Sequence, residues 1–280
     1  MRWLSLLSLD AVLVALTWQE VLARVPGIKL TIEERALLGI SLWIIYSVDH
    51  LLDGRVAYRS PETSAAEVAL SKKSYHMSGQ APRHDFVRKH SIFFLSASLL
   101  AIMIDTSLAR HIGRSLLMGG LLVALVTGIY LFLNTYFLRH AIWPFGKEIV
   151  ISLIFSIGCG LVPLCQIKES HHHLLIFWSM MLFFLLCLLN ATLIARLERG
   201  VAGKALLMGL MPSALWTLPS GLALLLLNKF LGHYVIIDPF LWSVMGLSLV
   251  PEIAKYYGKE VASLATDGAL VLGAVISFFG

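Results

Sequence analysis

Long apolar runs separated by short polar stretches occupy most of the chain. Each run is close to the ~20 residues that a helix needs to cross the hydrocarbon core of a bilayer. The runs are apolar on all sides and lack the alternation of membrane-barrel strands, so they indicate helices. The pattern predicts an all-α, multi-pass membrane protein of about nine transmembrane helices, with runs at positions 4–23, 36–52, 91–108, 116–138, 149–167, 174–197, 205–227, 234–250 and 261–279.

The composition excludes a water-soluble fold. Apolar residues make up 58% of the 280 positions, charged residues make up 14%, and the mean hydropathy is +0.81. Soluble domains are about 45–50% apolar and about 25% charged. We expect residues 1–280 to form a single integral membrane domain. The three cysteines lie in or beside apolar runs without the spacing of a metal site or a disulfide framework, which indicates a packing role for Cys159, Cys165 and Cys187.

The net charge of +5 comes from basic residues that gather on one side of the predicted bundle. Fifteen of the 22 Lys and Arg residues fall in the connections of that side, and seven fall in the others. Because basic residues are retained in cytoplasmic loops, this asymmetry predicts a protein of the cytoplasmic (inner) membrane with its N-terminus in the cytoplasm and its C-terminus outside. The same bias accounts for the basic isoelectric point, so we expect no nucleic-acid partner.

The longest predicted connection is a basic cytoplasmic loop at 53–90, which leads into the third helix. It carries seven basic and four acidic residues, and Arg83 and Arg88 stand near its end. Long loops are commonly functional lids or linkers. Two interpretations stay open, because the basic cluster either anchors the chain at the membrane surface or acts as a lid that binds an anion.

Two carboxylates end the second predicted helix. Asp49 and Asp53 are one helical turn apart in the segment YSVDHLLDGR at 46–55, so they share a face. Their mutual repulsion disappears when a divalent cation lies between them, and Mg²⁺ is commonly held by one or two carboxylates together with substrate phosphates. The pattern predicts a diphosphate bound through Mg²⁺. The alternative is that both carboxylates pair with neighbouring Arg or His side chains at the membrane surface.

Polar residues on two further helices are candidates to complete this site. Lys147 begins the fifth run at the predicted cytoplasmic mouth, where it either meets a phosphate or pairs with Glu148. Asn190 and Glu198 end the sixth run and lie within about 80° of one another around a helix, so they form a weaker pair of oxygen ligands. The alternative is an ordinary interhelical hydrogen bond for Asn190 and an ion pair with a neighbouring arginine for Glu198.

Together these features resemble the UbiA-type intramembrane prenyltransferases. The resemblance lies in the nine helices, the DxxxD motif, the long basic loop after it, the fifth helix that starts with Lys147 and holds a glycine-rich run, and the polar motif ending the sixth helix. In that family the first motif reads NDxxDxxxD. Asp49 and Asp53 match its last two aspartates, while Ile45 and Tyr46 replace the leading Asn-Asp. The second motif is a further set of aspartates, at whose spacing this chain has Asn190, Ile194 and Glu198.

The resemblance implies transfer of a prenyl group from an isoprenyl diphosphate to a membrane-soluble acceptor, often aromatic. Mg²⁺ and basic side chains would neutralise the leaving diphosphate. Tyr46 would line the allyl pocket, where an aromatic face stabilises a cation. The implied catalytic residues are Asp49, Asp53 and Tyr46. The implied metal ligands are Asp49, Asp53, Asn190 and Glu198, and the implied substrate-binding residues are Arg55, Arg83, Arg88, Lys147, Asn190 and Glu198.

Two other functions stay open. A protein of the same fold that has lost catalysis would serve in lipid binding or transport, as the replaced carboxylates of both motifs indicate. The segment DGRVA at 53–57 partly matches the motif of CDP-alcohol-type phospholipid phosphotransferases, although Asp49 precedes its aspartate by four residues rather than three.

Asp10 and Asp267 lie about two turns into their runs. Each either faces a cavity or hydrogen-bonds a neighbouring helix, and neither is assigned to the site.

Overall fold

The structure is a computed structural model that describes residues 9–56, 89–136, 146–167, 170–199 and 236–276 and the single positions 7, 86, 224 and 278. Within these ranges, the side chains at 53–56, 136, 170–172, 196, 198, 199, 259 and 260 lie outside the description. The regular elements of the described residues are helical, in the order α2 (Leu9–Arg24), α3 (Ile32–Val56), α6 (Ser91–Leu108), η1 (Ala109–His111), α7 (Arg114–Tyr136), α8 (Gly146–Gln166), α9 (Ser170–Arg199), α11 (Ile237–Tyr257) and α12 (Lys259–Ile276).

The described helices confirm an all-α membrane protein. Six of them are long and apolar enough to cross a bilayer, namely α3, α6, α7, α8, α9 and α11. The 16 residues of α2 and the apolar stretch Val261–Ile276 of α12 are shorter. Eight of the nine predicted runs overlap with these elements, and the predicted seventh run, 205–227, lies outside the described residues apart from position 224. The count of nine spans therefore stays a prediction.

The second predicted helix is longer than its apolar run. α3 continues past position 52 to Val56, so the backbone at Asp53 and Arg55 is helical rather than the start of a loop. Hydropathy marks where a helix leaves the hydrocarbon, and a helix can continue beyond that point, as α3 does here. The rest of the predicted loop falls outside the described residues, apart from Phe86, Lys89 and His90.

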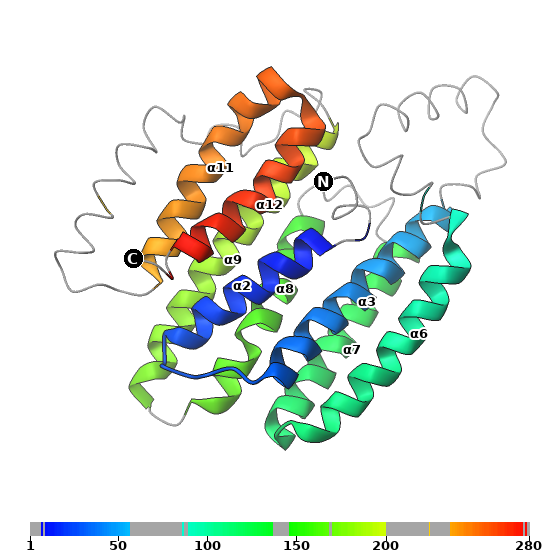
Figure 1. The fold of residues 1–280 in the computed structure, drawn as a ribbon, viewed down its shortest axis with the longest axis vertical. Coiled ribbons are helices and arrows are strands. Elements are labelled where there is room, and N and C mark those ends of the chain that lie inside the picture. Colours follow the sequence, from blue (N-terminus) through cyan, green and yellow to red (C-terminus); the bar gives the residue numbers. More distant parts are fainter. Residues whose placement is uncertain are drawn as a thin grey trace.

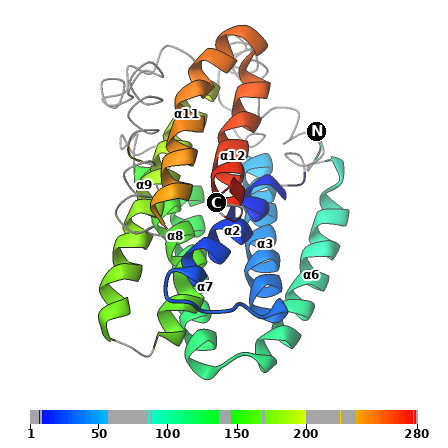
Figure 2. The same ribbon diagram turned by 60° about the vertical axis from the view of Figure 1, so that its left-hand side comes forward.

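The helices lie side by side in a bundle, with α2 between the α11–α12 pair and the group formed by α3, α6 and α7 (Figure 1, Figure 2). α2 contacts α3, α8, α9 and α12. It runs parallel to α12, because the Trp18 indole N–H donates to the Leu270 carbonyl oxygen at 3.1 Å and the Arg24 guanidinium lies 4.0 Å from the centroid of the Phe278 ring. Both helices thus begin at the same end of the bundle, as we expect for the first and last of nine spans.

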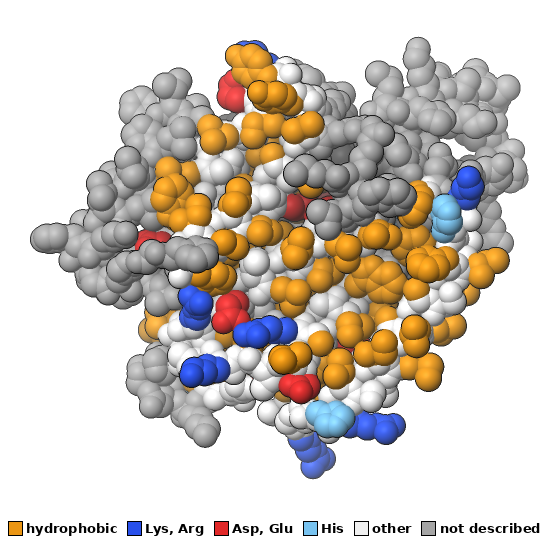
Figure 3. Space-filling model, viewed as in Figure 1, with side chains coloured by type: hydrophobic (Ala, Val, Ile, Leu, Met, Phe, Trp, Pro, Cys, Tyr) orange, Lys and Arg blue, Asp and Glu red, His pale blue; other side chains and the backbone are white. Residues whose placement is uncertain are grey.

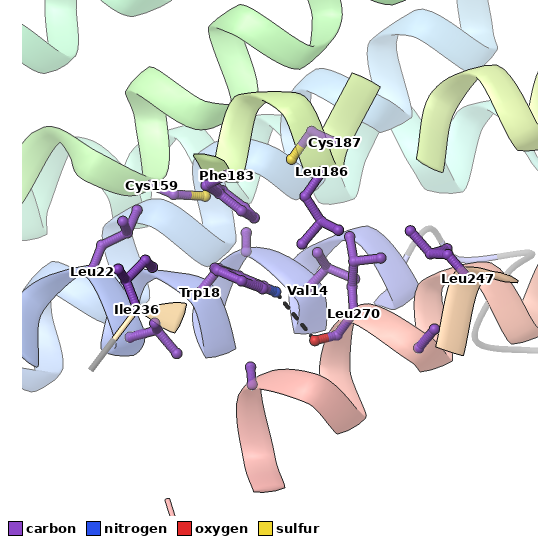
Figure 4. Packing of buried hydrophobic residues seen from close by; sticks show 14 of the residues in the cluster. Val14, Trp18, Leu22, Cys159, Phe183, Leu186, Cys187, Ile236, Leu247 and Leu270 are labelled. Atoms are coloured by element: carbon purple, nitrogen blue, oxygen red, sulfur yellow. Dashed lines mark hydrogen bonds between the residues drawn. The ribbon is translucent and has the colours of Figure 1, made fainter. Parts of the chain in front are cut away.

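The main apolar core surrounds α2. Trp18 is fully buried and stacks on Phe183 of α9, with ring centroids 4.5 Å apart and an interplanar angle of 16° (Figure 4). Such aromatic pairs contribute about 0.5–1.5 kcal/mol beyond the area they bury. Cys159 and Cys187 are free, buried thiols in the same cluster, as a packing role requires. The core therefore joins α2 to α8, α9 and α12.

The outer face of the bundle is apolar. Large hydrophobic side chains lie exposed along α6 and α7, and Ile92 reaches 83% exposure. In Figure 3, apolar side chains spread across the middle of the visible face, while Lys and Arg side chains gather mainly toward its lower end. An exposed apolar band of this extent fits contact with lipid tails. On α6 and α7 it includes Ile92, Phe93, Leu95, Leu99, Leu100, Met103, Met118, Leu121, Leu122, Leu125, Ile129 and Phe132.

Candidate functional site

A cavity of about 320 Å³ lies between α2, α3, α6, α7 and α8. Its volume is at the lower end of the range for small-molecule sites, roughly 300–1,000 Å³. One face of α3 forms a long wall, because its lining residues recur every three or four positions and so point to the same side of the helix. These residues are Glu34, Leu37, Leu38, Ser41, Leu42, Ile45, Tyr46 and Asp49.

We infer from the exposure of two lining residues that the cavity opens sideways along α7. Leu121 and Ala124 line it and are both exposed on the lipid-facing side of the bundle, Leu121 by 58%. On the inner side, Gly120 of α7 and Gly158 of α8 line the cavity without side chains to fill it. An apolar molecule in the bilayer can therefore reach the cavity between lipid-facing side chains without crossing a polar surface.

Two of the candidate site residues predicted from the sequence, Tyr46 and Asp49, line one end of this cavity. The lining face of α3 continues by one turn to position 53, where the backbone is still helical. The spacing of the two aspartates on one helix is thus confirmed, while the side chain of Asp53 lies outside the description. The phenol ring of Tyr46 lies 6.4 Å from the imidazole of His50, and Tyr130 of α7 also lines the cavity.

Lys147 lies at the same end of the bundle as Asp49. The side-chain amide of Gln166 donates to a carboxylate oxygen of Glu34, and a Cβ on Gly158 would lie 3.9 Å from Leu38, so α8 runs antiparallel to α3. The start of α8 therefore lies near the end of α3. The Lys147 side chain is exposed there and does not line the cavity.

Asn190 does not face the cavity. Its Nδ2 donates a hydrogen bond of 2.9 Å to Oδ1 of Asp267 on α12, and no residue of α9 lines the cavity among the described residues. The structure therefore does not bring Asn190 to Asp49, and it answers the question left open for Asp267, which binds a neighbouring helix. Asp10 accepts a hydrogen bond of 2.9 Å from the backbone N–H of Ala11 and does not line the cavity.

The remaining candidates are outside the description. The backbone is helical at Arg55 and Glu198, but their side chains are not described, and Arg83 and Arg88 lie wholly outside the described residues. Among the side chains that are described, no group of three or more His, Cys, Asp or Glu lies close enough to hold a metal ion. A metal at this end would therefore need ligands beyond the described side chains, such as Asp53, Glu198 or a substrate.

The sequence interpretation missed a carboxylate in the middle of the cavity. Asp105 of α6 lines the cavity, and its Oδ2 accepts a hydrogen bond of 2.7 Å from the Ser41 hydroxyl of α3. Its Oδ1 is buried and has no hydrogen-bond partner among the described residues. The available signal was an ionisable residue inside the apolar run 91–108, which in a membrane is a functional hypothesis by default.

A second polar group lies at the cavity end opposite Asp49. Glu34 and Gln19 line that end, and their side chains are 6% and 1% exposed. The sequence also contains a local signal for Glu34, because Thr31 and Glu34 have the spacing of a capping box at the start of a helix. The cavity is thus an apolar space with polar groups at both ends and one in between.

Comparison of the chain with protein-family models, with curated proteins and with solved structures finds no match.

Proposed function

We propose that the protein is a divergent UbiA-like membrane prenyltransferase that moves a prenyl group from an isoprenyl diphosphate to a membrane-soluble acceptor. The observation that carries the proposal is the apolar cavity with Asp49 at one end and a side opening toward lipid. In this proposal the prenyl chain lies along the wall of α3, and the diphosphate lies at the end where Asp49 lines the cavity, near the start of α8.

The residues at this end fit a Mg²⁺-bound diphosphate. Asp49 presents a carboxylate to the cavity, and position 53 falls on the same helical face one turn further. Two carboxylates and phosphate oxygens form the ligand set that Mg²⁺ favours. When bound, the ion neutralises the leaving diphosphate as the bond between C1 of the prenyl group and oxygen breaks. The proposed metal role of Asn190 gains no support from its contact with Asp267, and that of Glu198 stays a proposal.

The chain's own side chains have three tasks in this proposal. The basic groups Arg55, Arg83, Arg88 and Lys147 hold the diphosphate through charge-assisted hydrogen bonds. Tyr46 faces the cavity one turn before Asp49, where its ring can stabilise positive charge that develops on the allyl carbons. The apolar wall keeps water from this carbon centre, and the acceptor forms the new bond to C1 and then loses a proton.

The proposal places the Asp49 end at the cytoplasmic face of the inner membrane, with the N-terminus in the cytoplasm and the C-terminus outside. The asymmetry of basic residues supports this orientation. A water-soluble isoprenyl diphosphate would arrive from the cytoplasm, and the membrane-soluble acceptor would arrive through the side opening at Leu121 and Ala124.

A non-catalytic lipid-binding protein of the same layout is the second candidate. The contact between Asn190 and Asp267 favours it, because it gives the polar residue of the sixth predicted helix a structural role in place of a ligand role. In this case the same cavity holds a lipid without chemistry. The two candidates share the cavity and differ only at the Asp49 end.

The test uses purified protein in lipid nanodiscs with Mg²⁺ and geranyl, farnesyl or geranylgeranyl diphosphate. We expect diphosphate release in the presence of a mixture of membrane-soluble aromatic acceptors, and we expect Asp49→Asn to lower the rate by at least tenfold. Asp10→Asn is the matched control, because Asp10 does not line the cavity. Binding of the diphosphates without release would favour the second candidate, and neither binding nor release would overturn the proposal.

A further inference from the structure

One end of the cavity is lined by polar side chains that the proposed prenyl transfer does not use. Glu34 lies fifteen residues before Asp49 on α3, which corresponds to about 22 Å along the helix. A diphosphate at Asp49 therefore cannot contact Glu34 or Gln19. These two residues need a separate explanation, because polar groups are costly to bury beside an apolar space.

Hydrogen bonds from neighbouring groups stabilise the negative charge of the Glu34 carboxylate. Oε2 accepts a hydrogen bond of 2.9 Å from the backbone N–H of Thr31, and the backbone N–H of Glu34 donates to the Thr31 hydroxyl at 3.2 Å, so the two residues form a capping box. Oε1 accepts from the side-chain amide of Gln166. The carboxylate also lies in the first turn of α3, where the helix dipole favours negative charge. A cation is therefore not needed to neutralise it.

The buried side chain of Gln19, at the same place, contains an unused hydrogen-bond acceptor. Its side chain is 1% exposed, and its Nε2 donates to the backbone carbonyl of Glu34 at 3.4 Å. A carbonyl oxygen can only accept, so this contact fixes which end of the amide faces Glu34. The other end, Oε1, is buried and has no hydrogen-bond partner among the residues that the structure describes.

We propose that this end of the cavity is a recognition site for the hydroxyl group of a lipid alcohol, which donates its O–H to Oε1 of Gln19 while its apolar body extends along α3 toward Asp49. The atom without a partner at this end, Gln19 Oε1, accepts hydrogen bonds, so a purely accepting headgroup would leave it unpaired. An ammonium group is not required, because Thr31, Gln166 and the helix dipole already stabilise the carboxylate. A neutral hydroxyl supplies the missing donor.

The location agrees with a lipid alcohol. Glu34 lies in the first turn of the membrane-spanning part of α3, which begins at Ile32, so this cavity end is near one face of the bilayer. A lipid alcohol in the adjoining leaflet has its hydroxyl near that depth and its chain toward the membrane centre. The side opening at Leu121 would admit the chain without removing it from the hydrocarbon. This site needs neither Mg²⁺ nor a diphosphate, and it stands whether or not the protein transfers prenyl groups.

The test measures binding of farnesol and of its methyl ether to the full-length protein in nanodiscs without Mg²⁺. Both probes have the same chain, but only the alcohol has an O–H to donate. We expect the wild-type protein to bind the alcohol about fivefold more tightly, which is the size of one net hydrogen bond. Equal affinities in the wild type would overturn the proposal without recourse to any variant.

Three variants locate the hydroxyl within the cavity. Gln19→Met keeps the length of the side chain and removes the acceptor, and we expect it to bind both probes equally. Asp49→Asn and Asp105→Asn change two other polar groups of the cavity, and we expect both to retain the preference for the alcohol. Loss of the preference in Asp105→Asn with its retention in Gln19→Met would place the hydroxyl at mid-cavity and contradict the proposal. Because no diphosphate is present, these results are independent of the prenyl-transfer assay.

Discussion

The side chain of Asn190 donates a hydrogen bond of 2.9 Å to the carboxylate of Asp267, and this contact ties α9 to α12. It connects two polar residues inside apolar helices, the arrangement in which such contacts hold membrane helices together. It also turns Asn190 away from the cavity and from Asp49. The polar residue that the sequence offers as a second metal ligand thus has a hydrogen-bond partner on α12.

We expect the Asn190–Asp267 pair to contribute to stability and not to metal binding. In a double-mutant cycle with Asn190→Leu and Asp267→Leu, the coupling free energy should be about 0.6–1.7 kcal/mol, the range measured for hydrogen bonds between membrane helices. The measurement is unfolding in mixed micelles. If Asn190→Leu instead weakens the Mg²⁺ dependence of diphosphate release as strongly as Asp49→Asn does, Asn190 is a ligand and the structural role is wrong.

The helices were predictable from the sequence because their signals are local. Runs of ~20 apolar residues, the turn that separates Asp49 from Asp53 and the capping box of Thr31 and Glu34 all depend on neighbours within a few positions. The continuation of α3 to Val56 was not predicted, because hydropathy reports the edge of the hydrocarbon and not the extent of the helix.

The candidate site was predictable only in part, because it depends on how helices turn toward one another. A side chain on an apolar helix can face the cavity, another helix or lipid, and the sequence does not distinguish these directions when the whole circumference is apolar. Tyr46 and Asp49 line the cavity, whereas Asn190 at the same end of the bundle faces α12. Gln19 became a candidate only through the helices packed beside it, whereas Asp105 had a signal in the sequence as an ionisable residue inside an apolar run.

Two tryptophans provide a matched test of the core. Trp18 is fully buried, stacks on Phe183 and donates to the Leu270 carbonyl oxygen, whereas Trp178 is 57% exposed on the outer side of α9. We expect Trp18→Ala to lower the free energy of unfolding by about 3 kcal/mol, because it leaves a large void. Trp178→Ala should change it by about 0.5 kcal/mol or less. Equal losses in detergent unfolding would contradict the central position of α2.

Two glycines on α12 differ in the space around them. A Cβ on Gly273 would lie 2.1 Å from Oγ and 2.7 Å from the backbone N of Ser243, while a Cβ on Gly268 meets nothing within 4 Å. Gly273→Ala must therefore push α11 away, and we expect a loss of about 1–3 kcal/mol. Gly268→Ala should be neutral or stabilise by up to about 1 kcal/mol through helix propensity. The comparison uses thermal unfolding of the two variants, and the reverse order would show that α11 and α12 are packed differently.

The side opening predicts different effects for two adjacent leucines of α7. Leu121 and Leu122 are 58% and 62% exposed, but only Leu121 lines the cavity. Trp is larger than Leu and tolerated on a lipid-facing surface, so Leu121→Trp and Leu122→Trp should fold equally well. We expect Leu121→Trp to narrow the opening and slow the association of farnesol by about tenfold or more, because the chain must pass the indole, while the equilibrium affinity changes less. Leu122→Trp should bind at the wild-type rate. Stopped-flow measurements in nanodiscs separate the two constants, and unchanged association in both variants would mean that lipids reach the cavity by another path.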